Sequence, residues 1–152
     1  MATTSLLTTV KSFFKNENWV FEEVENQTIL RMFFQGKNGE WLCLAEVKEE
    51  LELFIFYSVS STKAPEGCRE SLTSLLMGIN SDLAIGGFEL DFQDGDIRFR
   101  SSISAKGTSL DETLIKNLVY ANVLTMDKYL PKINRLIEGR TAMSQWFNRI
   151  HR

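Results

Sequence analysis

Hydrophobic positions in the first 60 residues change from a helical spacing to a strand-like one. An apolar stripe at three- and four-residue intervals predicts an amphipathic first helix: Leu6, Leu7, Val10, Phe13 and Phe14. Four runs rich in aromatic and β-branched residues then predict strands: Trp19–Val24, Thr28–Gln35, Glu40–Lys48 and Leu51–Val59. Because short turns join these runs, we expect the strands to be antiparallel.

The second half alternates helical and strand patterns. Pro65 opens a helix whose apolar stripe is Cys68, Leu72, Leu75, Leu76 and Ile79. A hairpin of 84–92 and 96–103 follows around Asp94-Gly95, and the capping box Ser109–Glu112 begins a long helix or two stacked ones. We expect a break near Asp127–Pro131, an end at Gly139, and a short helix or tail over 141–152.

These elements predict an α+β fold in which helices pack on an antiparallel β-sheet. The order is α-β-β-β-β-α-β-β-α. No proline- or serine-rich linker divides the sequence, so we expect a single domain over 1–152, with its core at about 5–140.

Turn lengths predict the strand register. A two-residue Asn38-Gly39 turn places Arg31 opposite Glu46 and Phe33 opposite Leu44, whereas a four-residue Gly36–Gly39 loop shifts that pairing. At the next turn, a three-residue Lys48–Glu50 loop is preferred and sets Leu44 against Phe54.

The Asp94-Gly95 hairpin is expected to have one charged face. With these two residues as the loop, Asp91 lies opposite Arg98 and Glu89 opposite Arg100. The other face then carries the core side chains.

The third and fourth strands are apolar on both faces. One helical layer covers only one face of a sheet, so a helix, a loop or a partner chain must cover the second. We take Leu42, Leu44, Phe54 and Phe56 as candidates for a surface shared with a partner protein. The alternative, that these four side chains form the core face, is equally compatible with the pattern.

Composition narrows the function. The 152 residues include 17 basic and 20 acidic side chains, a net charge of 17 − 20 = −3, which gives no general attraction to nucleic acid or an anionic membrane. Apolar runs of five residues, such as Trp41–Ala45, are too short to span a bilayer. Residues 128–152 hold six basic side chains and one acid, which predicts a solvated basic face or an acidic partner.

Candidate catalytic and metal-binding chemistry is sparse. The one histidine, His151, is the penultimate residue, which removes the common histidine-based catalytic schemes. Cys43 and Cys68 suit core thiols in a reducing cytoplasm, and no Cys/His cluster or complete calcium loop predicts a metal or other cofactor. The competing enzyme hypothesis is a small hydrolase that uses the carboxylates of Glu46, Glu49, Glu50 and Glu52.

The segment Gly87–Ile103, with Asn80 at the preceding helix end and Met126–Ile133 after it, resembles the YbjN family of bacterial proteins over about residues 5–140. The aromatic-rich N-terminal half is similar to the cyanobacterial branch. The resemblance implies a fold like that of class I type III secretion chaperones, although those usually have three strands before the middle helix. It also implies a non-enzymatic, protein-binding chaperone-like role, or a role as a sensory-transduction or stress regulator, in a homodimer.

Overall fold

One antiparallel sheet of six strands, in the order β1-β2-β3-β4-β6-β5, organises the computed structural model, which describes residues 5–151. The helices are α1 (Leu6–Asn16), α2 (Arg69–Ser81) and α3 (Glu112–Ile150). The strands are β1 (Phe21–Glu23), β2 (Ile29–Gln35), β3 (Glu40–Lys48), β4 (Leu53–Val59), β5 (Gly87–Leu90) and β6 (Ile97–Ser104). Short 3₁₀ turns lie at Glu49–Leu51 and Glu66–Cys68. The predicted α+β class and element order are confirmed.

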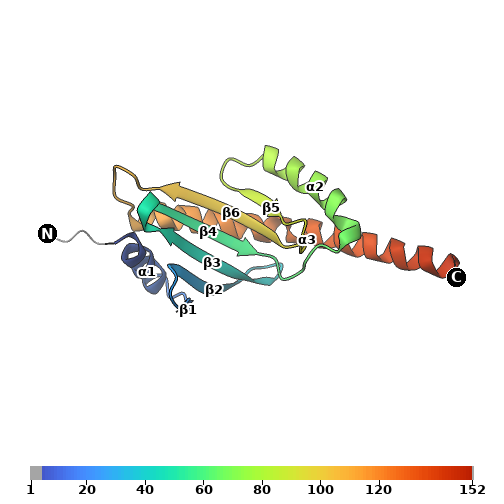
Figure 1. Ribbon diagram of the computed structural model, residues 1–152, viewed down its shortest axis with the longest axis horizontal. Coiled ribbons are helices and arrows are strands. Elements are labelled where there is room, and N and C mark those ends of the chain that lie inside the picture. The colour runs from blue at the N-terminus through green and yellow to red at the C-terminus, as the bar shows by residue number, and fades with distance from the viewer. Residues whose placement is uncertain (1–4, 152) are drawn as a thin grey trace.

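Helices α1 and α3 pack on one face of the sheet. Figure 1 shows α3 running along the sheet, with α1 beside its beginning and α2 next to β5. The stripe of α1 buries Val10, Phe13 and Phe14, as its spacing predicts, and the ring of Phe14 stacks on Phe56 of β4. The hydrophobic core therefore lies between this face of the sheet and the helices.

Helix α3 is a single element of 39 residues, so the predicted break near Pro131 and the predicted end at Gly139 are both wrong. Proline lacks an N–H, which leaves the carbonyl of the residue four positions earlier without its helical donor. That carbonyl belongs to Asp127, and the Nδ2 of Asn38 donates to it at 2.9 Å. The N-cap is Asp111, whose side chain accepts from the Leu114 N–H, rather than Ser109.

The β2–β3 turn is the four-residue Gly36–Gly39 loop, because Gln35 pairs with Glu40. The carboxylate of Asp127 accepts the N–H groups of Lys37 and Asn38 at 3.0 and 2.8 Å. A Cβ on Gly36 would lie 2.5 Å from an oxygen of that carboxylate, so glycine is required there. The two-residue alternative was wrong: Phe33 lies opposite Leu42 and Arg31 opposite Leu44.

The β3–β4 turn is also longer than predicted. Lys48 pairs with Leu53, so the loop is Glu49–Glu52 and Leu44 lies opposite Tyr57, not Phe54. The Glu49 carboxylate accepts the main-chain N–H groups of Leu6 and Leu7 at 3.3 and 2.9 Å, which joins this loop to the beginning of α1.

The β5–β6 hairpin is shifted by two residues from the predicted register. Leu90 pairs with Ile97, and Asp91–Asp96 form the loop. Arg69 at the start of α2 donates to the Phe92 carbonyl at 2.8 Å, and Gly95, with φ of 81°, packs against Arg69 and Ala64. The predictions that Asp91 faces Arg98 and that Glu89 faces Arg100 are therefore both wrong: Glu89 lies opposite Arg98, and Gly87 lies opposite Arg100.

Candidate protein-interaction surface

The sheet has a second face, opposite α1 and α3, which we call the open face. In β3 the side chains alternate between the two: Trp41, Cys43, Ala45 and Val47 are buried toward the helices, while Leu42 and Leu44 are half-buried. Residues directly opposite each other in neighbouring strands share a face, so the register identifies the remaining members of the open face.

Two rows of apolar side chains cross the open face. Phe33, Leu42 and Val59 form one row across β2, β3 and β4, and Leu44 and Tyr57 form the row beside it. The ring of Phe33 is 62% exposed and the other four side chains are half-buried. We call these five residues the apolar strip: Phe33, Leu42, Leu44, Tyr57 and Val59.

The four residues proposed from the sequence lie on different faces. Leu42 and Leu44 are at the centre of the apolar strip. Phe54 and Phe56 pair with Val47 and Ala45 on the helix-covered face and are 0% exposed. They are core residues, and the expectation that they share a surface with Leu42 and Leu44 is corrected. Strand alternation is the signal that identifies Phe33, Tyr57 and Val59 in their place, once the register is known.

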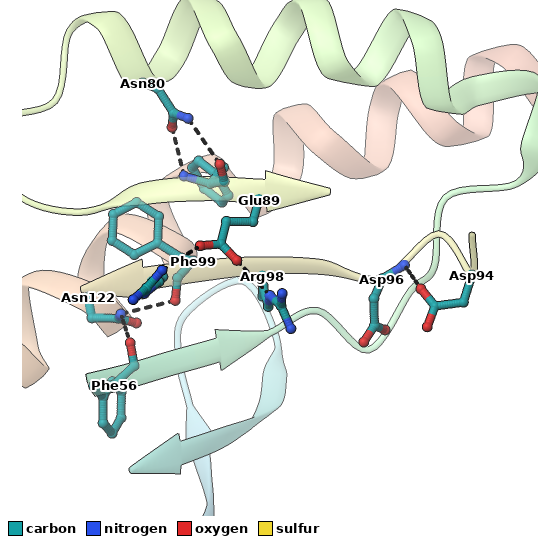
Figure 2. Close-up of polar contacts among 10 residues, drawn as sticks. Phe56, Asn80, Glu89, Asp94, Asp96, Arg98, Phe99 and Asn122 are labelled. Carbon is teal, nitrogen blue, oxygen red and sulfur yellow. Dashed lines mark hydrogen bonds and ion pairs between the residues drawn. The ribbon is translucent and has the colours of Figure 1, made fainter. Parts of the chain in front are cut away.

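Charged side chains flank the strip where β4 meets β6. Glu89 contacts Arg98 at 2.8 Å (Figure 2) and Arg100 at 3.6 Å. The Arg98 guanidinium lies 5.4 Å from the centre of the Tyr57 ring. Burial alone would lower the pKa of Arg98, but the hydrogen bond and the charge of Glu89 raise it above its ordinary value. Three of the four residues predicted for the charged face of the hairpin therefore lie together: Glu89, Arg98 and Arg100.

Asp91 lies outside this cluster. Its carboxylate accepts a hydrogen bond from the main-chain N–H of Gln93 at 2.8 Å, a local turn contact. The carboxylate of Asp94 accepts one from the main-chain N–H of Asp96 in the same way (Figure 2). These acidic side chains therefore shape the loop and do not extend the charged face of the hairpin.

The two edges of the sheet differ. On the β5 edge, Asn80 of α2 accepts the Phe88 N–H at 2.7 Å and donates to the Phe88 carbonyl at 3.0 Å, as a neighbouring strand would (Figure 2). The other edge is formed by the three-residue β1. The amide of Asn80 thus blocks strand addition at the centre of β5.

A buried asparagine anchors the sheet to α3 beneath the strip. Asn122 donates to the carbonyls of Phe56 and Phe99 at 2.9 and 3.1 Å (Figure 2). It also donates to the hydroxyl of Ser101 at 2.9 Å and accepts from Ser58 at 2.6 Å. Asn122 occupies a buried position of the helical stripe, and a single polar residue in such a stripe is the only sequence signal for this network.

The residues of the enzyme hypothesis are dispersed. Glu46 lines a cleft beside β1 with residues 23–29, whereas Glu49 and Glu52 line a different cleft of about 600 Å³ beside α1. The carboxylate of Glu49 is already engaged by the start of α1. Glu49 and Glu52 share one cleft, but Glu46 lies in another, so the proposed carboxylates do not converge as a group.

The cysteines lie in the core. Burial raises the pKa of the Cys43 thiol to about 12, which disfavours the thiolate needed for nucleophilic chemistry. Cys68 is buried with its sulfur 3.9 Å from the Ile137 carbonyl. Residues 5–151 contain no group of three or more His, Cys, Asp and Glu side chains arranged to hold a metal ion. None of the helices in this range combines the length and apolar character needed to cross a bilayer.

Residues 6–135 match the family model YbjN, described as "Putative bacterial sensory transduction regulator". The chain belongs to the YbjN family. Its fold is similar to the crystal structure of YbjN from E. coli, a putative transcription regulator by its description, with a TM-score of 0.59 and 16% identity over 91% of this chain and 92% of that one.

The fold of this YbjN-family chain is also similar to the HopA1–SchA chaperone–effector complex. The TM-score is 0.53 and the identity 15%, with 80% of this chain and 88% of that chain covered. The type III secretion chaperone-like fold expected from the sequence is therefore confirmed. No functionally curated protein matches the chain.

Proposed function

We propose that this YbjN-family chain is a non-enzymatic protein-binding module, chaperone-like or regulatory, and that the apolar strip is its contact surface. The observation that carries the proposal is the position of Leu42 and Leu44 on the sheet face opposite α1 and α3, where they are joined by the exposed ring of Phe33. Apolar side chains gathered on an uncovered face are characteristic of protein-binding sites.

The chemistry of the strip suits an extended apolar segment of a partner. Tyr57 offers an aromatic ring with a polar tip, of the kind enriched at protein interfaces. Arg31 at one side and the Glu89–Arg98 pair at the other supply charges that fix the direction of a bound segment.

The likeness to a chaperone–effector complex supports a protein as the ligand. The proposal includes self-association as a homodimer and a reducing cytoplasmic setting, the latter supported by the two buried free thiols of Cys43 and Cys68.

Affinity capture from native extract tests the proposal when wild type is compared with matched variants. Leu44→Glu places a charge in the strip and is expected to remove the captured protein. Met77→Glu adds the same charge on exposed α2, away from the strip, and is expected to retain it. Circular dichroism verifies that each variant is folded. Equal capture by both variants would refute the role of the strip.

A further inference from the structure

The last part of α3 extends beyond the rest of the molecule. Ile137 is its final buried residue, and every residue from 138 to 151 is exposed. Figure 1 shows this end of α3 projecting past α2 and the sheet. We call residues 138–151 the arm.

The arm has an apolar stripe that nothing in its own chain covers. Met143, Trp146, Phe147 and Ile150 are spaced at i, i+3, i+4 and i+7, so they share one side of the helix, and each is 54 to 64% exposed. His151 stacks on Phe147 with the ring centres 4.1 Å apart and widens this aromatic surface. Four large apolar side chains on one exposed helical face indicate a docking element.

Charge distinguishes the surfaces that could cover the apolar stripe of the arm. The arm carries Arg140 and Arg149 against one acid, Glu138, a formal charge of 2 − 1 = +1, so the remaining chain carries −3 − 1 = −4. Pairing two arms would place like net charges together. The apolar strip is flanked by Arg31, Arg98 and Arg100, but Glu22 lies opposite Arg31 and Glu89 pairs with the other two, so this rim carries no net negative charge to attract the arm. The arm therefore fits an acidic apolar surface better than it fits a second arm or the apolar strip.

Such a surface lies around β1. Residues 17–25 include four glutamates and no basic residue, and a cleft of about 460 Å³ is lined there by Trp19, Val20, Phe33 and Tyr120, among others. Val20 is 90% exposed. Lys116 and Lys11 pair with Glu17 and Glu23, whereas Glu22 and Glu25 make no ion pair with any residue that the structure describes. We call 17–25 with this cleft the acidic cleft.

The arm cannot reach the acidic cleft of its own chain. Helix α3 is continuous, and it carries the arm to the end of the molecule opposite α1 and β1 (Figure 1). A second copy supplies the complementary surface. If two copies exchange arms about a two-fold axis, both arms are covered and the contact area doubles.

We propose that the arm of one copy docks in the acidic cleft of a second copy, with Trp146 and Phe147 against Val20 and with Arg149 near Glu22 or Glu25. This inference rests on the proposed self-association and assigns its surface; the acidic cleft shares Phe33 with the apolar strip but does not include Leu44.

Disulfide cross-linking between two variants, each with one introduced cysteine, tests the contact. Val20→Cys and Phe147→Cys are mixed and oxidised under native conditions, while the native Cys43 and Cys68 stay buried. The mixture is expected to give about tenfold more disulfide-linked dimer than a control mixture of Val20→Cys with Met77→Cys, because a disulfide requires Cα atoms about 4.4 to 6.8 Å apart. Dimer from Phe147→Cys alone at the same yield would show arm-to-arm pairing and overturn the proposal, as would a yield equal to the control.

Sedimentation velocity tests the same contact without cross-linking. Wild type is expected to sediment as a dimer, and Trp146→Glu as a folded monomer, because the arm supports no core residue. Arg149→Glu or Glu22→Arg is expected to weaken the dimer, and the two together in one chain to restore it. Monomeric wild type that floats with phosphatidylglycerol vesicles would assign the arm to lipid and refute the proposal. If cross-linking fails while Leu44→Glu still abolishes capture, the arm assignment fails alone.

Discussion

The side-chain amide of Asn38 donates to the main-chain carbonyl of Asp127, the carbonyl that Pro131 leaves without a helical donor. This hydrogen bond thus replaces the one that α3 lacks at Pro131, and it joins the β2–β3 turn to that helix. Asn38→Ala is expected to lower the free energy of unfolding by about 1–2 kcal/mol, since a partly buried carbonyl loses its partner. Urea denaturation measures the loss.

The Pro131→Ala background provides the control. Alanine at this position supplies an N–H to the Asp127 carbonyl, so Asn38→Ala is expected to cost less there than in wild type. An equal cost in both backgrounds would contradict the explanation for the uninterrupted helix.

The corrected hairpin register makes a distinct prediction. Arg98→Glu is expected to lose more stability than Arg98→Ala, by about 0.5–1 kcal/mol, because the new carboxylate faces Glu89. In a Glu89→Ala background this difference should disappear, and in an Asp91→Ala background it should persist. Thermal melting of Arg98→Glu and Arg98→Ala in the three backgrounds measures these differences. If the difference disappears with Asp91→Ala and persists with Glu89→Ala, Asp91 faces Arg98 and the register described above is wrong.

Asn122 is expected to be a major determinant of stability. Asn122→Ala leaves the Ser58 and Ser101 hydroxyls without this buried partner and should lower the free energy of unfolding by about 3 kcal/mol. Asn117→Ala, at an exposed position on the same helix, should change it by less than about 0.5 kcal/mol. Similar losses in urea denaturation for both variants would argue against the network.

Cys43 makes stability depend on alkaline pH. Its folded pKa of about 12 exceeds the unfolded value of 9.0, so above pH 9 the unfolded chain releases a proton that the folded chain retains. Stability is therefore lost as pH rises from 9 toward 12. The advantage of wild type over Cys43→Ala should shrink by about 1.4 kcal/mol between pH 8 and pH 10. Denaturant titrations at both pH values measure this difference in the free energy of unfolding. If it is the same at pH 8 and pH 10, the Cys43 thiol is not protected from solvent and the prediction is wrong.

The sequence predicted the elements of the fold better than their register, and the errors have a common physical cause. Each mispredicted turn is fixed by a group distant in the chain: Asp127 binds the β2–β3 turn, α1 binds Glu49, and Arg69 binds the loop before β6. Local turn propensity contains no information about such contacts, so the shorter turns appeared preferable.

The same cause limited the prediction of the site. Alternation in β3 identified Leu42 and Leu44, but the misplaced Glu49–Glu52 loop put Phe54 beside Leu44 in place of Tyr57. A shift of three residues reverses the face of every side chain in β4. Helix α3 passes Gly139 because an exposed glycine costs a helix only about 1 kcal/mol.

Site-specific photo-cross-linking tests the central claim, that the apolar strip binds protein, most directly. A benzophenone side chain at position 44 is expected to give a discrete protein adduct in native extract, and the same group at position 77 on α2 should not. Excess wild type should suppress the adduct, and excess Leu44→Glu should not. Identical adducts from both positions, or a position-44 adduct that Leu44→Glu suppresses as well as wild type does, would contradict the claim.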